Sequence, residues 1–322
     1  MQRFSRSTRN IIVILAGLGW SGIACAAQTP AAPQPNSLRQ LLWQKTVRRS
    51  FKDARRFDGV MGIGVRDLTS GQSWYCHGRQ VFPTASTIKT TLLFELLHLA
   101  DQHRLNLNTP VRIRHAATVG GSGLLHNLGD GTTTMSLGDL AVAMMQLSDN
   151  SATNLLIGRI GMQRVNNEMR ALGLRHTALR REMMDSAAAR AGRENVATPR
   201  DIVRLLRTVF QGHALRPASR QLYLDWMELA SQQSGTPLSR GVKAGVPVAD
   251  KPGVLEHVRC DCGLVLLPRR PYALCVFTTF DASGKLGEQA ITRESHLWYE
   301  YFVRIATSSR YGRAMYRSTS AP

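Results

Sequence analysis

The spacing of hydrophobic residues changes along the chain and divides it into three parts. Apolar residues of 38–51 recur at helical spacing, and Val60–Val65 then alternates apolar residues with glycines, which predicts a helix followed by a β-strand. The turn residues Thr69–Gly71 allow 73–77 to return as a second strand. From 84 to 212 apolar residues recur at intervals of three and four, which predicts helices almost throughout.

After residue 235 the strand pattern returns at 246–251, 262–267 and 272–280, and a last helix is expected at 288–306. Strands at both ends with helices between them predict an α/β protein of the α+β type. Its antiparallel sheet, flanked by helices, is built from both chain ends, and a separate all-helical lobe comes from the middle. We expect the active site between the two lobes.

The same pattern predicts the domain boundaries. A catalytic domain is expected over 38–306, with the sheet lobe formed by 38–80 and 229–306 and the helical lobe by 81–228. Residues 307–322 are expected to form a disordered basic tail.

The first residues have the pattern of an export signal. A cationic start precedes the short apolar run Ile11–Leu18, and Ala24–Ala26 supplies small residues for cleavage. We therefore expect a signal peptide over 1–26, a Pro- and Ala-rich linker over 27–37, and a periplasmic or secreted protein. The apolar run is too short to predict a stable membrane span, and its retention as an anchor is the alternative.

Charge and cysteine content narrow the function classes. The formal net charge is +19, but the arginines are scattered without interleaved aromatic residues, so no nucleic-acid partner is expected. A basic surface that attracts anionic polymers of the cell envelope is the interpretation we prefer. Cys76, Cys260, Cys262 and Cys275 follow the signal, and export permits disulfides whose pairing the sequence leaves open. They lack the spacing of a zinc site, so neither a metal nor another cofactor is expected.

Three short motifs carry the candidate chemistry. The first is Ser86-Thr-Ile-Lys89, in which a lysine follows a serine by one helical turn, so that the amine can activate the hydroxyl as a nucleophile. The second is Ser148-Asp-Asn150, which ends an apolar helix and offers a second hydroxyl for proton transfer and an amide for substrate binding.

The third motif is Lys251-Pro-Gly253, at the end of a predicted strand. Its lysine can stabilise negative charge, and its glycine lets a substrate backbone approach the strand edge. Lys243-Ala-Gly245 has the same form, but we prefer Lys251 because a strand pair follows it.

The three motifs in this order resemble those of the class A β-lactamases and penicillin-binding proteins, over roughly residues 38–306. The resemblance implies that Ser86 is the acylated nucleophile, that Lys89 activates it, and that Ser148 passes a proton to the leaving nitrogen. Lys251 would tune that step. The remaining roles that it implies are an oxyanion hole from the backbone N–H groups of Ser86 and Val254, and amide binding by Asn150.

The chain departs from this family in a loop after the helical core. The family carries Glu-x-x-Leu-Asn there, and its glutamate activates the water that releases the acyl group. In this chain Met183 falls at the position of that glutamate. Glu182, Asp185 and Glu194 are weaker substitutes.

Two further features bear on how a substrate is held. Pro252 replaces the usual hydroxyl residue between the lysine and the glycine of the third motif. Arg259 and Arg293 are the candidates for binding a substrate carboxylate.

Three functions remain open. The first is a monomeric hydrolase that opens β-lactam rings through an acyl-serine. The second is a D-alanyl peptidase or esterase that acts on peptidoglycan-like fragments. The third is a penicillin-binding sensor that deacylates slowly. The matched motifs favour the first, and the missing loop glutamate favours the other two.

Overall fold

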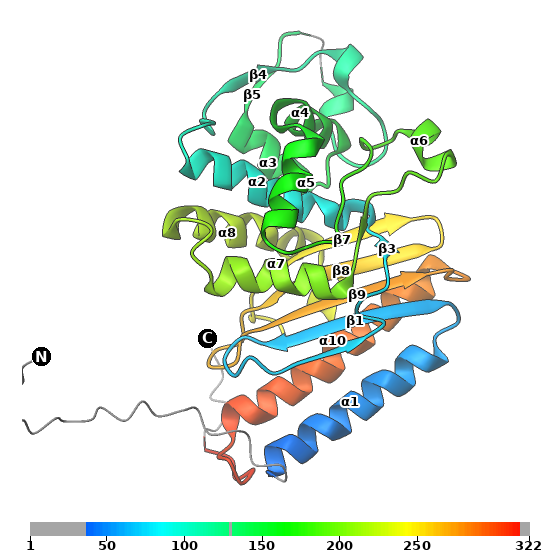
Figure 1. Cartoon of the computed structure of the whole chain (residues 1–322), viewed down its shortest axis with the longest axis vertical. Helices are drawn as coiled ribbons and strands as arrows, with labels where there is room; N and C mark the ends of the chain where they lie inside the picture. The colour runs from blue at the N-terminus through cyan, green and yellow to red at the C-terminus, as the bar shows by residue number, and fades with distance from the viewer. Residues whose placement is uncertain (1–36, 129–130, 316–322) are drawn as a thin grey trace, which may run out of the picture. The chain divides into compact units, whose positions relative to one another are not determined.

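The computed structural model describes residues 37–128 and 131–315 (Figure 1). The expected signal peptide and almost all of the expected linker lie outside these residues. The helices are α1 (Leu38–Arg56), α2 (Lys89–Asp101), α3 (Leu137–Gln146), α4 (Asn150–Ile160), α5 (Met162–Ala171), α6 (Ser186–Arg190), α7 (Pro199–Gln211), α8 (Pro217–Ser234), α9 (Pro237–Arg240) and α10 (Gly284–Thr307), with 3-10 turns η1 (Ala85–Ile88), η2 (His115–Ala117) and η3 (Leu125–Asn127). The strands are β1 (Val60–Asp67), β2 (Ser73–Cys76), β3 (Phe82–Pro83), β4 (Pro110–Arg112), β5 (Thr134–Ser136), β6 (Val196–Ala197), β7 (Val248–Leu255), β8 (Val258–Val265) and β9 (Tyr272–Thr279).

A five-stranded antiparallel sheet forms the centre of the fold. Its strand order is β2-β1-β9-β8-β7, so the first strands of the chain pair with the last. β1 runs antiparallel to β9 over its whole length, from Val60 opposite Thr279 to Asp67 opposite Tyr272. The predicted fold class, a mixed protein with one antiparallel sheet built from both chain ends, is confirmed.

The sheet separates two layers of helices. α1 and α10 cover one face, and the helices from α2 to α8 lie on the other (Figure 1). The alternation in β1 explains how both faces are packed. Ile63 and Val65 point into the core under α1 and α10, while Gly62 faces the helical side. A Cβ at Gly62 would come within 2.5 Å of the Phe82 ring, so the glycine permits this close approach.

Helix α2 is the central helix of the helical layer. Its apolar residues, such as Leu93 and Leu96, are fully buried, as the near absence of polar residues predicts. Lys89, Thr90 and Thr91 at its first turn are also fully buried. A buried lysine needs polar partners, and these are supplied by the second motif.

The C-terminal segment differs from the expectation of disorder. Helix α10 continues to Thr307, Ser308 then forms an isolated β-bridge with Ala314, and Met315 N donates a hydrogen bond to Thr307 O. Residues 307–315 therefore form a hydrogen-bonded turn, because the chain reverses after α10 and pairs with itself. Residues 316–322 lie outside the described residues.

Two further findings concern the cysteines and the membrane. Cys262 and Cys275 face each other on β8 and β9 and form a disulfide, while Cys76 and Cys260 are buried thiols. Within 37–128 and 131–315, no helix has the length and apolar character that crossing a bilayer would require.

Candidate active site

The first motif lies where the turn η1 passes into helix α2. Ser86 is in the turn, and Lys89 is the first residue of the helix. Ala85, directly before the serine, has φ of +46°, a left-handed conformation that is uncommon for residues other than glycine. This sharp turn leaves Ser86 partly exposed, while Lys89 lies fully buried beneath it.

The second motif surrounds the lysine with acceptors. Lys89 Nζ donates to Ser148 O at 2.6 Å, to Ser148 Oγ at 3.1 Å and to Asn150 Oδ1 at 3.0 Å. Ser148 Oγ in turn donates to Ser86 Oγ at 2.8 Å. The hydrogen bonds therefore connect Lys89 to Ser86 through Ser148, rather than directly as the sequence spacing predicts.

The electrostatics of Lys89 suit a proton acceptor. Burial lowers its pKa well below the usual value, the nearby Lys251 ammonium lowers it further, and Asp149 opposes both effects. A lysine with a lowered pKa is neutral in a larger fraction of molecules, and only the neutral amine can accept a proton.

Ser148 is held in place by its neighbours. Its φ is +53°, a left-handed conformation that turns the end of α3 into the start of α4. Asp149 caps α4 by accepting from Ala152 N at 2.8 Å, and its other oxygen accepts from Leu124 N at 2.7 Å and Leu125 N at 2.9 Å. Asp149 thus braces the loop between the two helices.

Lys251 of the third motif lies on β7 and is almost fully buried. Its Nζ donates to Met145 O at 3.0 Å, at the end of α3. Burial lowers its pKa to about 8, and Asp250 and Asp261 oppose this shift. Lys243, the alternative lysine, is exposed in the turn before β7 and lines neither cavity at Ser86.

Strand β7 passes close to the nucleophile turn. Thr87 Oγ1 donates to Lys251 O at 2.9 Å, which ties η1 to the strand. A Cβ at Gly253 would lie 2.6 Å from Thr84 O and 2.6 Å from Cys260 Sγ. Glycine is therefore required for this approach, and the next residue, Val254, reaches the cavity beside Ser86.

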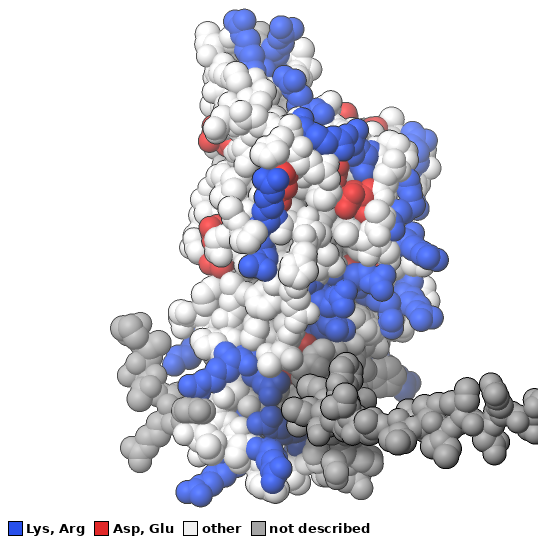
Figure 2. All heavy atoms as spheres, turned by 60° about the vertical axis from the view of Figure 1, so that its left-hand side comes forward, with Lys and Arg blue, Asp and Glu red and all other residues white. Residues whose placement is uncertain are grey.

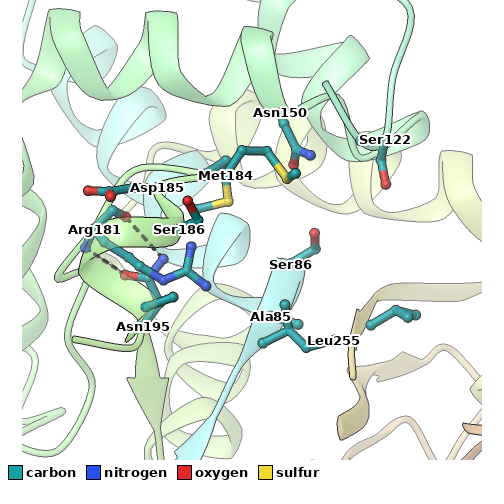
Figure 3. A pocket seen from close by; sticks show the side chains of 14 residues that line it. Ala85, Ser86, Ser122, Asn150, Arg181, Met184, Asp185, Ser186, Asn195 and Leu255 are labelled. Atoms are coloured by element: carbon teal, nitrogen blue, oxygen red, sulfur yellow. Dashed lines mark hydrogen bonds between the residues drawn. The ribbon is translucent and has the colours of Figure 1, made fainter. Parts of the chain in front are cut away.

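Two cavities meet at Ser86. One of about 370 Å³ is also lined by Asn150 and by the loop before α6 (Figure 3). The other, of about 280 Å³, is also lined by Ser148 and Lys251. Six of the seven residues that the sequence nominates for the site line one or both cavities: Ser86, Ser148, Asn150, Lys251, Gly253 and Val254. The seventh, Lys89, lies beneath them and donates a hydrogen bond to Ser148.

Met183 occupies a fixed position in the first cavity. Its backbone N–H donates to Asn154 Oδ1 at 2.8 Å, and its carbonyl accepts from Asn154 Nδ2 at 3.1 Å. The side chain of Asn154 therefore holds the loop against α4, with the Met183 side chain towards the cavity. A thioether stands at this point, and it cannot accept a proton from water.

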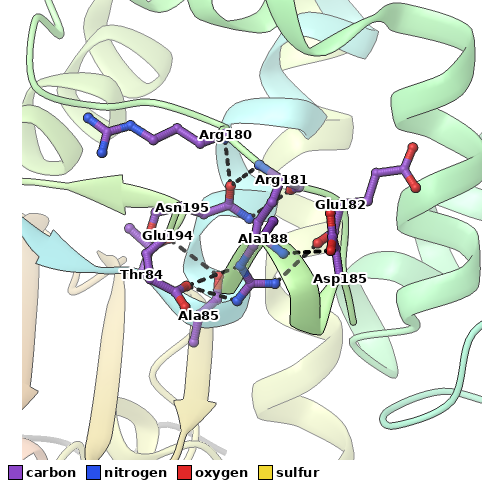
Figure 4. Close-up of polar contacts among 9 residues, drawn as sticks. All are labelled: Thr84, Ala85, Arg180, Arg181, Glu182, Asp185, Ala188, Glu194 and Asn195. Carbon is purple, nitrogen blue, oxygen red and sulfur yellow. Dashed lines mark hydrogen bonds and ion pairs between the residues drawn. The ribbon is translucent and has the colours of Figure 1, made fainter. Parts of the chain in front are cut away.

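The three acidic candidates near this loop are engaged elsewhere or exposed. Glu182 is exposed and does not line the cavity, and in Figure 4 its side chain extends away from the loop's polar contacts. Asp185 lines the cavity but caps α6 by accepting from Ala188 N at 2.8 Å. Glu194 forms an ion pair with Arg181 at 2.8 Å.

The two arginines considered for binding a substrate carboxylate line different cavities. Arg259 lines the second cavity together with Ser86, and its Nη1 donates to Leu255 O at 2.7 Å and to Val258 O at 2.8 Å. Its Nε lies 3.6 Å from Glu288 Oε1. Arg293 lines a different cavity, between α1 and α10.

Ser122 and Met184 are two of the lining residues that the sequence did not nominate. Ser122 lines both cavities, and Met184, with φ of +63°, points towards Asn150 in the first (Figure 3). The glycine-rich sequence of 120–123 was a usable signal, because glycines often mark a loop that approaches other groups closely. Within the described ranges, no group of three or more His, Cys, Asp or Glu residues could hold a metal ion.

The family comparison agrees with this geometry. Residues 43–302 match the model of a family described as the β-lactamase enzyme family. The chain belongs to this family. The matched span includes all three motifs and both layers of helices around the sheet.

Relatives within the β-lactamase family resemble the chain over much of their length. The β-lactamase CARB-3 of Pseudomonas aeruginosa is 31% identical over 60% of this chain and 67% of its own length. The carbapenem-hydrolysing β-lactamase KPC of Klebsiella oxytoca is 27% identical over 83% of this chain and 88% of its own.

Solved structures of similar proteins include β-lactamases and a penicillin-binding protein. An ancestral class A β-lactamase, GNCA, superposes with a TM-score of 0.74 at 27% identity and covers 80% of this chain and all of its own. PBP-A superposes with a TM-score of 0.73 at 27% identity, covering 84% of this chain and 98% of its own. A mutant of PBP-A was solved as an acyl-enzyme complex with penicillin G.

Proposed function

We propose that this protein is a serine hydrolase that opens β-lactam rings through an acyl intermediate on Ser86. The observation that carries the proposal is the chain of hydrogen bonds from Lys89 through Ser148 to Ser86, at the meeting point of two cavities. The similarity to β-lactamases over most of the chain supports the substrate class.

Acylation begins with removal of the Ser86 proton. Once Lys89 is neutral, the two hydroxyl groups turn so that their hydrogen bonds reverse. Ser148 then takes the Ser86 proton and gives its own to the Lys89 amine, and Ser86 Oγ forms a bond to the lactam carbonyl carbon. The resulting oxyanion faces the backbone N–H groups of Ser86 and Val254. The C–N bond then breaks, and the ring nitrogen takes the proton that returns from Lys89 through Ser148. Lys251, close by, stabilises negative charge during this transfer.

Substrate binding uses both cavities. The Asn150 amide is available to a substrate amide in the first cavity. Arg259 is the better candidate for a substrate carboxylate, because it lines the second cavity beside Ser86 and Arg293 does not. Pro252 has no hydroxyl to share in this contact, so the carboxylate depends more on Arg259.

Deacylation needs water to attack the ester on Ser86. A carboxylate beside this water would accept its proton, but Met183 stands at that place in the loop. Deacylation here depends on weaker bases, so we expect it to be slower than acylation.

Intact-mass spectrometry after mixing with a penicillin or a cephalosporin tests the proposal. We expect the mass to rise by that of the drug and then return to its starting value, with hydrolysed drug in solution. The variant Ser86→Ala should form no adduct, because its side chain has no oxygen to acylate.

The outcomes separate the alternatives. A permanent adduct would indicate a penicillin-binding sensor, and the lack of an adduct with either drug would favour a peptidase or esterase. An adduct on Ser86→Ala protein would exclude the mechanism. The melting temperature of Ser86→Ala serves as the folding control.

We also propose that the chain is exported, loses residues 1–26 and works as a monomer with a catalytic domain over 38–306. The basic start, the apolar run and the small residues at 24–26 support export. The seven residues nominated for the site all belong to one chain, so the proposed chemistry calls on no residue from a partner subunit.

A further inference from the structure

Helix α1 carries an unusual concentration of positive charge. It has seven basic residues and one acidic residue within 19 positions. Its inward stripe, formed by Trp43, Thr46, Ser50 and Ala54, is buried against the rest of the fold. The opposite face is therefore free to carry residues that the fold itself does not need.

That outer face follows a strict helical pattern. Leu41, Lys45, Arg48, Lys52 and Arg55 recur at intervals of four and three, and all five are exposed. We call these five residues the α1 stripe. Within the described parts of the chain, its two lysines and Arg48 make no ion pair or side-chain hydrogen bond. The side chain of Arg55 lies 6.0 Å from the centroid of the Phe51 ring.

Exposed apolar side chains accompany this charge. Leu38, Leu41 and Phe51 are 53%, 48% and 47% exposed, although all three are large hydrophobic residues. A surface designed only for solubility, or for a soluble polyanion, gains nothing from such side chains. Together with basic residues they are typical of a helix that lies in the interface of an anionic membrane.

The C-terminal turn, at 308–315, adds further basic and apolar side chains near the start of α1. Arg39 Nη2 donates to Ser308 O at 2.9 Å, which places this turn beside the start of α1. The turn adds two basic and two large apolar exposed side chains and no acidic residue: Arg310, Tyr311, Arg313 and Met315.

We propose that the α1 stripe and the C-terminal turn dock this protein onto an anionic phospholipid membrane. Headgroup phosphates bind the basic residues, and the apolar side chains enter the interface. α1 lies on the side of the sheet opposite the helical layer (Figure 1), so docking leaves the cavities at Ser86 open. Figure 2 shows basic side chains over the whole height of the face that it draws, so long-range attraction draws the protein to an anionic surface in general, and the α1 stripe and the turn decide which side docks.

Co-sedimentation with vesicles tests this proposal. The purified protein, with the same N-terminus in every variant, is mixed with vesicles of phosphatidylcholine containing 30% phosphatidylglycerol, or of phosphatidylcholine alone. We expect salt-sensitive binding to the anionic vesicles only. Lys45→Glu/Arg48→Glu/Lys52→Glu should lower the partition coefficient by roughly a hundredfold, at about 1 kcal/mol for each basic residue.

Three exposed arginines of the helical layer supply the matched control. The variant Arg114→Glu/Arg159→Glu/Arg175→Glu has the same net charge as the triple variant of α1 and should bind at least tenfold more tightly than it does. Equal loss in both variants would overturn the proposal, because binding would then depend on net charge alone. The melting temperature of each variant shows whether it is folded.

A second variant distinguishes a membrane from a soluble polyanion. Leu41→Asn/Phe51→Asn keeps every charge, and we expect it to bind anionic vesicles several-fold more weakly and polyphosphate unchanged. If this variant binds vesicles like the parent protein, the apolar side chains do not enter a bilayer. The partner would then be a soluble polyanion, and the membrane proposal would be wrong.

Discussion

At the scale of single residues, the site is a small network of strained and buried groups. Ala85 and Ser148 both have left-handed backbone conformations, and Lys89 and Lys251 are both buried. A left-handed backbone conformation and a buried lysine are each unfavourable alone, because backbone strain and desolvation of the charge oppose folding. They persist together because hydrogen bonds between the motifs hold them, and this arrangement presents the Ser86 hydroxyl to the cavity.

The loop residue Met183 gives a direct prediction. Met183→Glu places a carboxylate where the thioether now lines the cavity, so that water can lose a proton to it during attack on the acyl-enzyme. We expect the adduct to disappear about 100-fold faster or more, the range typical of general-base catalysis. The measurement is the decay of the adduct by intact mass after a penicillin pulse.

Met183→Gln is the matched control, because glutamine is similar to glutamate in size and polarity but cannot accept a proton from water. Equal decay rates for the glutamate and glutamine variants would show that a base at this position is not what limits release. Melting temperatures of both variants show whether the loop still packs.

The main residues of the site could be predicted from sequence because their chemistry lies in short motifs. Ser86, Lys89, Ser148 and Lys251 are brought together as expected. The path of the hydrogen bonds could not be predicted. The Lys251 ammonium donates to the backbone carbonyl of Met145, and a backbone acceptor leaves no trace in residue type.

At the scale of elements, the packing of α10 against α1 depends on a buried carboxyl group. Glu294 is almost fully buried, and its Oε2 accepts from Ser50 Oγ at 2.5 Å. Its pKa is raised to about 8, chiefly by burial; the Asp53 carboxylate adds to the rise, while hydrogen bonds from Ser50 and Trp298 and the charge of Arg293 oppose it. The group is therefore mostly protonated at neutral pH.

This pKa predicts that stability falls as the pH rises from about 4.5 to about 8. The pKa of Glu294 is higher in the folded protein than in the unfolded one. The stabilisation that protonated Glu294 gives to the fold is therefore complete below about pH 4.5 and is lost as the pH rises through about 8. Glu294→Gln cannot ionise, so its free energy of unfolding in urea should fall less between pH 6 and pH 9. Between pH 6 and pH 9, the free energy of unfolding of the parent protein should fall by about 1 kcal/mol or more beyond the fall in the variant.

Glu300→Gln is the control on the same helix, since its side chain is 44% exposed. It should keep the pH dependence of the parent protein. If Glu294→Gln also keeps it, ionisation of Glu294 does not determine the stability of this helix pair.

Helices and strands with a regular spacing of apolar residues were predictable from the sequence, and very short elements were not. β1, α2 and α10 follow their apolar spacing closely. The two-residue strands β3 and β6 pair only because the tertiary fold brings Phe82 beside Ala197, and so few residues show no period. The turn at 307–315 was also missed, because its pairing involves mainly backbone groups.

At the scale of the whole molecule, export and the monomeric state are the properties to test. Protein recovered from outside the cytoplasm should begin at Ala27, which N-terminal sequencing measures. We propose a monomer, so light scattering should give the mass of one chain. A protein that still carries residues 1–26 would favour the retained anchor, and a dimer would contradict the monomer.

The strand order has a consequence for how this molecule is made. β1 needs β9 as its neighbour, and β9 begins only at Tyr272, long after β1 has been synthesised. Until then a ribosome holds a chain whose central sheet is unfinished, with β1 able to join only β2. Such a chain stays open to handling by chaperones or a secretion channel until β9 has been synthesised and can pair with β1.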